Sequence, residues 1–118
     1  MPTVDPHETV SGLLSHLEPR DREAARFARL LLASGWEVIT CWGPVQMDVW
    51  ALELARGDIR VRFGIERGVS DGVLVRHPGG QEPLGRVVER WAATRGIDQP
   101  QLVPHGLLAL ATLDVPDQ

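Results

Sequence analysis

The sequence predicts an α+β fold, in which an antiparallel four-stranded β-meander packs in two layers against N-terminal and C-terminal helices. Apolar residues recur at helical spacing before Gly35 and again after Pro83, whereas between them they alternate with polar residues, as in half-buried strands. A chain of 118 residues suits one domain with one core. The expected order is α-α-β-β-β-β-α with a short C-terminal segment. The parts of this single domain (1–118) are a helical hairpin (1–35), the meander (36–77), a helix (82–96) and a tail (97–118).

Two helices are expected before the sheet. Asp5 can cap the first helix, Pro6 suits its first position, and Glu8 stands at the capping-box position. Pro19 is expected to end this helix and open the second, which stops at Gly35 in the left-handed conformation. The residues expected to face the core are Val10, Leu13, Leu14 and Leu17 in the first helix and Ala24, Phe27, Ala28 and Leu31 in the second.

The clearest strand pairing is a hairpin that joins residues 47–55 to residues 58–65 across a two-residue turn at Arg56-Gly57. Because side chains alternate between the faces of a sheet, this register places the large apolar residues on one face and a charge pair on the other. A slip of one residue would destroy both results. The expected pairs are Leu54 with Ile59, Leu52 with Val61, Trp50 with Phe63, and Glu53 with Arg60.

The two outer strands follow the same alternation. The first, residues 36–42, is expected to place Trp36 and Val38 inside and Ile39 and Cys41 on the opposite face, before a loop at 43–46. The fourth, residues 72–77, follows a turn-rich stretch at 67–71 and precedes a loop at 77–80. Its inward residues are Val73 and Val75, and its outward residues are Leu74 and Arg76.

The C-terminal part begins with a helix that starts near Pro83 and ends at Gly96. The tail beyond it contains two prolines, and its segment 107–113 is expected to form a short helix on the core, with an added edge strand as the alternative. The apolar stripe of the helix consists of Leu84, Val87, Val88, Trp91 and Ala92.

Composition narrows the function classes. The net charge of −4 argues against a general nucleic-acid binder, because phosphate contacts dominate that affinity. Cys41 is the single cysteine and cannot form an intrachain disulfide. The longest apolar run, 107–111, is far shorter than a bilayer of about 30 Å requires. No basic-then-apolar leader opens the chain, so we expect a cytoplasmic protein.

No motif in the chain specifies a reaction or a cofactor. Cys41 has no neighbouring histidine that could act as its base. The four histidines, His7, His16, His77 and His105, are scattered and lack metal-ligand spacing. We therefore predict no catalytic residues, no metal, no cofactor and no enzymatic activity.

The outer face of the meander is the best candidate site. Apolar positions mix there with arginines, unlike the uniformly polar face of a solvated sheet. Arg62 and Arg76 are expected to lie opposite one another, a like-charge pair that costs free energy unless an acidic group answers it. Coverage of this face by the C-terminal segment is the competing interpretation. The candidate interface consists of Val49, Glu53, Arg60, Arg62, Leu74 and Arg76, flanked by Met47 and Ala51.

The composition of this face predicts a small domain that binds another protein. We expect it to be a monomer or homodimer that does not associate with a membrane. The stretch Gly57-Asp58-Ile59-Arg60-Val61-Arg62, followed by Glu66-Arg67-Gly68, sits in a chain of small size and acidic charge. Over residues 23–91 the size, acidity and element order resemble those of small bacterial immunity proteins of toxin–antitoxin and polymorphic-toxin systems. The resemblance implies a protein that occludes a toxin's active site and uses no catalytic residue of its own.

Two alternatives stay open. In a nucleic-acid-associated regulator, the outer arginines would contact phosphates and Trp36, Trp42 or Trp50 would stack on bases, which the acidic net charge disfavours. In a small-ligand binder, Trp50, Phe63 and Trp91 would line a pocket between the layers.

Overall fold

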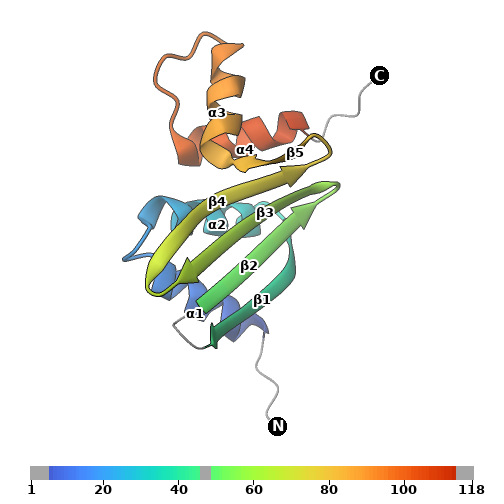
Figure 1. Ribbon diagram of the computed structural model, residues 1–118. Helices are drawn as coiled ribbons and strands as arrows, with labels where there is room; N and C mark the ends of the chain where they lie inside the picture. The colour runs from blue at the N-terminus through green and yellow to red at the C-terminus, as the bar shows by residue number, and fades with distance from the viewer. Residues whose placement is uncertain (1–5, 46–48, 114–118) are drawn as a thin grey trace.

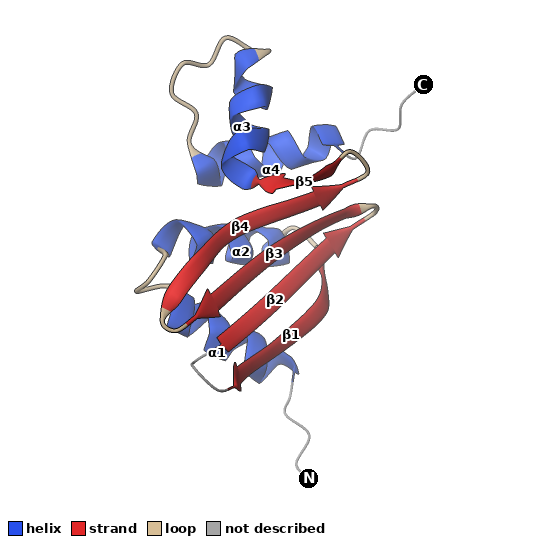
Figure 2. Cartoon of the chain, viewed as in Figure 1, coloured by secondary structure: helices blue, strands red, loops and turns tan. Residues whose placement is uncertain are grey.

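Figures 1 and 2 show a computed structural model that describes residues 6–45 and 49–113. The predicted α+β class is confirmed, and the sheet gains a fifth, short strand. The elements are α1 (Pro6–Leu17), α2 (Arg22–Ala33), β1 (Glu37–Val45), β2 (Val49–Arg56), β3 (Ile59–Glu66), β4 (Val69–His77), β5 (Gly80–Pro83), α3 (Leu84–Ala93) and α4 (Leu102–Leu113).

The five strands form one antiparallel sheet in the order β1-β2-β3-β4-β5. The helices α1 and α2 cover one face of the sheet, which we call the inner face (Figures 1 and 2). The helices α3 and α4 pack on one another beside β4 and β5, and α4 also contacts α2. The opposite face of the sheet, which we call the outer face, is crossed by none of the described helices (Figure 1).

The core lies between the inner face and the helices. Its helical residues include all those that the periodicity of the sequence predicts, which are buried, and also Ala25, Ala109 and Leu110. A buried leucine or phenylalanine side chain contributes about 1.5–3 kcal/mol, so these positions dominate the stability of the domain. The sheet contributes Trp50, Leu52, Leu54, Ile59, Val61, Phe63, Ile65, Val73 and Val75.

Local capping explains where the first helices begin and end. The start of α1 at Pro6 agrees with the prediction, although its proposed cap, Asp5, lies outside the described residues. Asp21 caps α2 by accepting a hydrogen bond from the Ala24 N–H at 3.1 Å, so this helix starts later than Pro19. Gly35 has a φ of +89° and ends α2 in the left-handed conformation, as predicted.

The predicted register of the central hairpin is wrong by two residues. The β2–β3 pairs are Trp50 with Ile65, Leu52 with Phe63, Leu54 with Val61 and Glu53 with Arg62. The turn is therefore Gly57-Asp58 and not Arg56-Gly57. Of these two turn residues, Gly57 has a positive φ (+57°) and Asp58 does not. A positive φ at the first turn position alone is the arrangement of type II′ hairpin turns. Because the shift is an even number, every side chain keeps its predicted face.

The predicted facing of the first strand is also wrong in part. Trp36 is buried and Val38 pairs with inward-facing Leu54, both as expected, although Val38 is 41% exposed on this edge strand. Cys41, in contrast, packs half-buried against the core instead of on the opposite face. The cause is a register shift between Val38 and Thr40, which makes Ile39 an extra residue and reverses the alternation beyond it. The strand also continues through most of the predicted loop at 43–46, whose last residue lies outside the described ranges.

The turns beyond β3 are shorter than expected. A two-residue turn at Arg67-Gly68, with positive φ at both residues, replaces the predicted turn at 67–71, so β4 begins at Val69. Val73 and Val75 are buried as predicted. The predicted loop at 77–80 is wrong at its end, because Gly80 already pairs with β4 as the first residue of β5.

The C-terminal helices agree with the sequence in type and differ in length. The five residues of the predicted apolar stripe of α3 are all buried, and Gly96 takes a positive φ after the helix. The helix predicted at 107–113 is confirmed as α4, which starts five residues earlier, at Leu102. Pro104 is compatible with this start because the first turn of a helix needs few backbone donors. Within the described residues, no helix is long and apolar enough to cross a membrane.

Candidate protein interface on the outer face of the sheet

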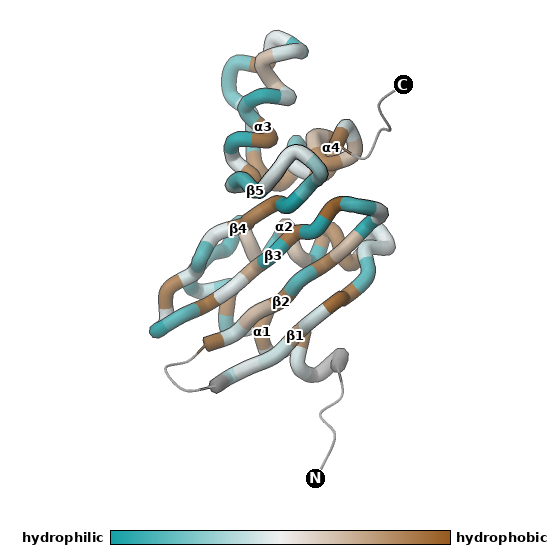
Figure 3. The backbone as a smooth tube through the Cα atoms, turned by 45° about the vertical axis from the view of Figure 1, so that its right-hand side comes forward, coloured by the Kyte–Doolittle hydropathy of each residue, from teal (hydrophilic) through white to brown (hydrophobic). Residues whose placement is uncertain are grey.

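The outer face carries the candidate residues on three adjacent strands. Hydrophobic and hydrophilic positions alternate along the strands (Figure 3), and the outward positions include both apolar residues and arginines. The helix α4 packs against α2 and α3 instead of this face, so residues 102–113 do not cover it. Of the six candidate interface residues, Val49 lies half-buried near the start of β2, and its predicted neighbour Met47 lies outside the described residues.

The other five candidates lie together. Glu53, Arg60, Arg62, Leu74 and Arg76 line one shallow hollow of about 60 Å³ with Gln81 of β5. Sites for small molecules usually enclose about 300–1,000 Å³ and bury most of the ligand. This hollow is too small for such a ligand, so its surroundings suit contact with another macromolecule.

The strand register decides which charges face one another. The predicted pair of Arg62 with Arg76 is wrong, because the tight turn at Arg67-Gly68 shifts the β3–β4 pairing by two residues. Arg76 lies opposite Arg60, and Arg62 lies opposite Leu74. A like-charge pair directly across two strands destabilises a sheet unless an acidic group answers it.

Glu53 provides the single carboxylate among the arginines that line this hollow. Arg76 Nη2 lies 3.5 Å from Glu53 Oε1, which faces it across β3. Arg60 Nη1 donates to the backbone oxygens of Gly57 (3.0 Å) and Ile59 (3.3 Å). Arg62 is exposed and makes no ion pair with any described residue. Three guanidinium groups and one carboxylate leave an excess of two positive charges on a chain whose net charge is −4.

An exposed aromatic residue extends the site toward β1. Trp42 is 43% exposed and pairs with Ala51, whose side chain lies on the outer face beside Glu53. Tryptophan and arginine are enriched in protein interfaces, where they contribute much of the binding energy. Trp42 was not among the predicted interface residues, because strict alternation from Trp36 and Val38 places it on the inner face and only the irregularity at Ile39 turns it outward.

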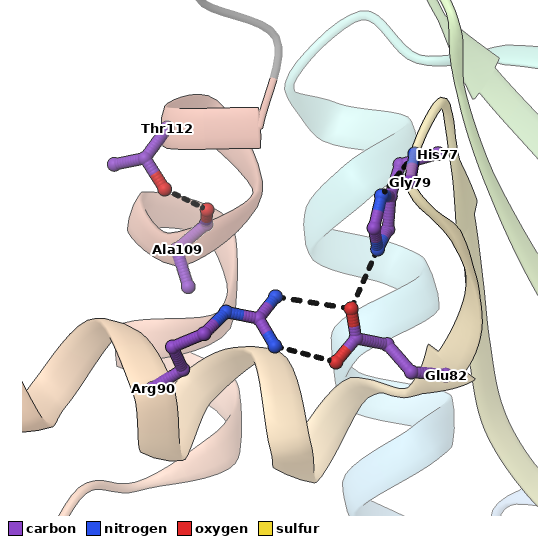
Figure 4. A network of polar contacts seen from close by, with 6 residues as sticks. All are labelled: His77, Gly79, Glu82, Arg90, Ala109 and Thr112. Carbon is purple, nitrogen blue, oxygen red and sulfur yellow. Dashed lines mark hydrogen bonds and ion pairs between the residues drawn. The ribbon is translucent and has the colours of Figure 1, made fainter.

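A second polar network holds β5 against α3 (Figure 4). Arg90 donates two hydrogen bonds to the Glu82 carboxylate, at 2.8 and 3.0 Å, and His77 Nε2 lies 2.5 Å from the same carboxylate. The Gly79 N–H donates to His77 Nδ1, which leaves Nε2 to carry the proton that is donated to Glu82. The hydrogen bonds from Arg90, together with His77, lower the pKa of Glu82 to about 2. No nucleophile takes part, so this network stabilises the junction of sheet and helix.

The other predicted candidates lie apart. Cys41 is on β1 and His77 on β4, with two strands between them, and burial raises the pKa of the Cys41 thiol. Trp50, Phe63 and Trp91 are each at most 8% exposed and pack in the core. Nowhere in residues 6–45 and 49–113 do three His, Cys, Asp or Glu side chains gather as metal ligands.

No protein-family model, curated protein or solved structure matches this chain. The chemistry of its surfaces is therefore the basis for its proposed function.

Proposed function

We propose that this chain is a small protein-binding domain whose outer sheet face binds an acidic segment of another protein. The observation that carries the proposal is a hollow on an uncovered sheet face that is lined by three arginines and one carboxylate, which pairs only with Arg76. A partner that supplies carboxylates would relieve the repulsion between Arg60 and Arg76 and would pair with Arg62.

The surroundings of the hollow favour a protein over a nucleic acid. Leu74 and Trp42 provide apolar area next to the charges, as at the centre of a protein interface. Of the three tryptophans that could stack on bases, Trp36 and Trp50 are buried, which leaves Trp42 alone. The net charge of −4 adds repulsion of a polyphosphate backbone at long range.

The finer form of this proposal is an immunity-type inhibitor, which binds a toxin and blocks its active site. An outer face that carries binding groups and no catalytic constellation suits this role. Co-expression with the product of the adjacent reading frame tests it: inhibition of that product by the wild-type chain supports the finer form. A neighbour with no toxic activity removes it and leaves the broader proposal standing.

The broader proposal is tested with defined ligands, followed by NMR chemical shifts of the backbone amides. The probes are a short peptide of alternating Glu and Leu, the same peptide with Lys in place of Glu, and single-stranded DNA. We expect the acidic peptide to shift amides of β2, β3 and β4 around the hollow. Binding should weaken when Arg60→Glu and Arg62→Glu are combined, by at least about tenfold, or about 1.4 kcal/mol.

A matched control separates the site from the overall charge. Arg22→Glu with Arg26→Glu reverses two exposed arginines of α2 and changes the net charge by the same amount. This pair should leave peptide binding within about twofold of wild type, a change of only about 0.4 kcal/mol. Equal loss in both double variants, or tighter binding of DNA with a steep dependence on salt, would overturn the proposal in favour of non-specific or phosphate-driven association.

A further inference from the structure

A second hollow lies where α4 meets the end of the sheet. It encloses about 320 Å³, which falls at the lower end of the range of about 300–1,000 Å³ typical of small-molecule sites. Its walls come from three segments that are distant in sequence, namely the start of β1, the β2–β3 hairpin and α4. The lining residues are Trp36, Arg56, Ile59, Leu107, Leu108, Leu110 and Ala111.

The walls of this hollow are almost entirely apolar. Ile59 and Leu110 are each 1% exposed and belong to the core. Leu108 is 54% exposed, and α4 contains no Asp, Glu, Lys or Arg over its twelve residues. A helix that is apolar on all sides is ordinarily buried, so an apolar ligand against this side of α4 would remove unfavourable exposure.

One cation stands among these apolar walls. The Arg56 guanidinium lies 5.4 Å from the centre of the Trp36 ring, in cation–π contact. It donates to the Ser34 carbonyl oxygen and forms no ion pair with any described residue. Since a guanidinium has five N–H donors, most of its capacity is left for an anion.

An unpartnered donor lies in the same wall. Trp36 is 6% exposed, and its indole Nε1–H is buried without a hydrogen-bond partner among the described residues. Buried donors of this kind are rare because an unmade hydrogen bond costs free energy. The ring lies next to Arg56 in the wall of the hollow, so a bound ligand would contact the ring and change the environment of this N–H.

We infer that this hollow is a binding site for a small apolar carboxylate, whose hydrocarbon part packs against the leucines of α4 and whose carboxylate pairs with Arg56. The Trp36 ring forms part of the wall beside that carboxylate, so its N–H resonance reports on binding. The apolar walls select the hydrocarbon part, and the single guanidinium selects a single negative charge. This site lies apart from the outer-face hollow, since the two share no lining residue.

The test uses the full chain and three probes of eight carbon atoms each: octanoate, octanol and octylammonium, each below the concentration at which it aggregates. The readout is the NMR resonance of the Trp36 indole N–H, assigned by its loss in Trp36→Phe. Octanoate should shift this resonance saturably and raise the unfolding temperature. Octanol should bind at least about tenfold more weakly, which corresponds to loss of the charged contact, and octylammonium should not bind.

Three variants locate the ligand. Arg56→Gln should abolish the preference for octanoate over octanol, and Ala111→Phe should fill the hollow and abolish binding of both. Arg62→Gln, which removes one arginine from the outer face, should leave octanoate binding unchanged. Circular dichroism and the unfolding temperature report whether each variant folds, and the Arg56 result decides the matter if Ala111→Phe does not fold.

Some outcomes would overturn the inference. These are the absence of a saturable octanoate shift in the wild-type chain, an octanoate preference that survives Arg56→Gln, or an equal loss in Arg62→Gln. The acidic-peptide experiment reports on the other hollow, so either proposal can fail while the other stands.

Discussion

The two hollows of this domain differ in how they are built and in what they can bind. The outer-face hollow is shallow, at about 60 Å³, and is lined by strand residues in which arginines outnumber the single carboxylate. The hollow at α4 is about five times larger, at 320 Å³, and places one guanidinium among apolar walls. The first requires only neighbouring strands of one sheet, whereas the second requires a helix to pack on the sheet.

The difference shows what each region contributes to the fold. The outer-face arginines are solvated, and surface ion pairs such as Glu53 with Arg76 contribute only about 0–1 kcal/mol. The buried walls of the α4 hollow are also part of the core, so a ligand there would share residues with the stability of the domain. Truncating a wall residue should therefore cost more stability at the α4 hollow than at the outer face.

The largest difference in stability between the two hollows is expected when one lining residue of each is truncated. Leu110→Ala should lower the free energy of unfolding by about 2–5 kcal/mol, because it removes a side chain that is 1% exposed and leaves a cavity. Arg62→Ala should change it by less than about 0.5 kcal/mol, because the side chain is exposed. Urea unfolding measures both values. Similar effects of the two changes would contradict the division into a core-linked site and a solvated face.

A smaller change in stability is expected for a substitution that disturbs the packing of α4 against α2. Gly106→Ala would place a Cβ 2.6 Å from Phe27 Cε1, so α4 must shift away from α2 at a cost of about 1–3 kcal/mol. Gly85→Ala in α3 is the control, since open space surrounds that position and alanine favours a helix by about 1 kcal/mol. Thermal unfolding should move in opposite directions for the two variants. Octanoate binding should weaken only in Gly106→Ala, and an unchanged affinity there would separate the ligand site from the position of α4.

The junction of β5 and α3 should make the stability of the domain depend on pH, because the Glu82 carboxylate holds these two elements together. Its pKa of about 2 in the folded state lies below the ordinary value of 4.5, so the unfolded state binds the proton more readily. The stabilisation is therefore complete above about pH 4.5 and is lost as the pH falls toward 2. Because the partner Arg90 is 55% exposed and its field is screened by water, we expect the effect to amount to about 1–2 kcal/mol.

The measurement is the free energy of unfolding between pH 2 and 7, compared with that of Glu82→Gln. The difference between the two chains should shrink as the pH falls through this range. Glu89→Gln, an exposed change on α3 next to Arg90, should follow the wild-type curve. A constant difference between wild type and Glu82→Gln would mean that the carboxylate charge does not stabilise this junction.

The smallest effect is expected for Glu53, the single carboxylate of the outer-face hollow. Glu53→Gln should change the free energy of unfolding by no more than about 0.5 kcal/mol, as for other exposed ion pairs. It should also tighten binding of the acidic peptide, by less than about tenfold, because Arg76 is released for the ligand. Isothermal titration measures the affinity. Weaker binding in Glu53→Gln would mean that the carboxylate takes part in the interface instead of competing with the partner.

Much of this architecture could be predicted from periodicity alone. The apolar stripe of α3 is buried as the helical spacing predicts, and so are the inward residues of β2 and β3. The outer-face residues Arg60, Arg62 and Arg76 were also placed correctly, because the error in the hairpin register was an even number of residues. Which arginine faces which residue could not be predicted, since turn type moves a register by two residues without changing any alternation.

The amino-acid sequence by itself determined the class of fold, most core positions and the outward residues of β2, β3 and β4, because local spacing decides which face of a helix or strand is apolar. Tertiary structure decided the bulge at Ile39, the pairing of Arg60 with Arg76, and the seat of α4 against Phe27. It also created the hollow between Trp36, Arg56 and α4, whose residues lie up to 75 positions apart. Such a site depends on how distant segments pack, and no local pattern encodes their distance.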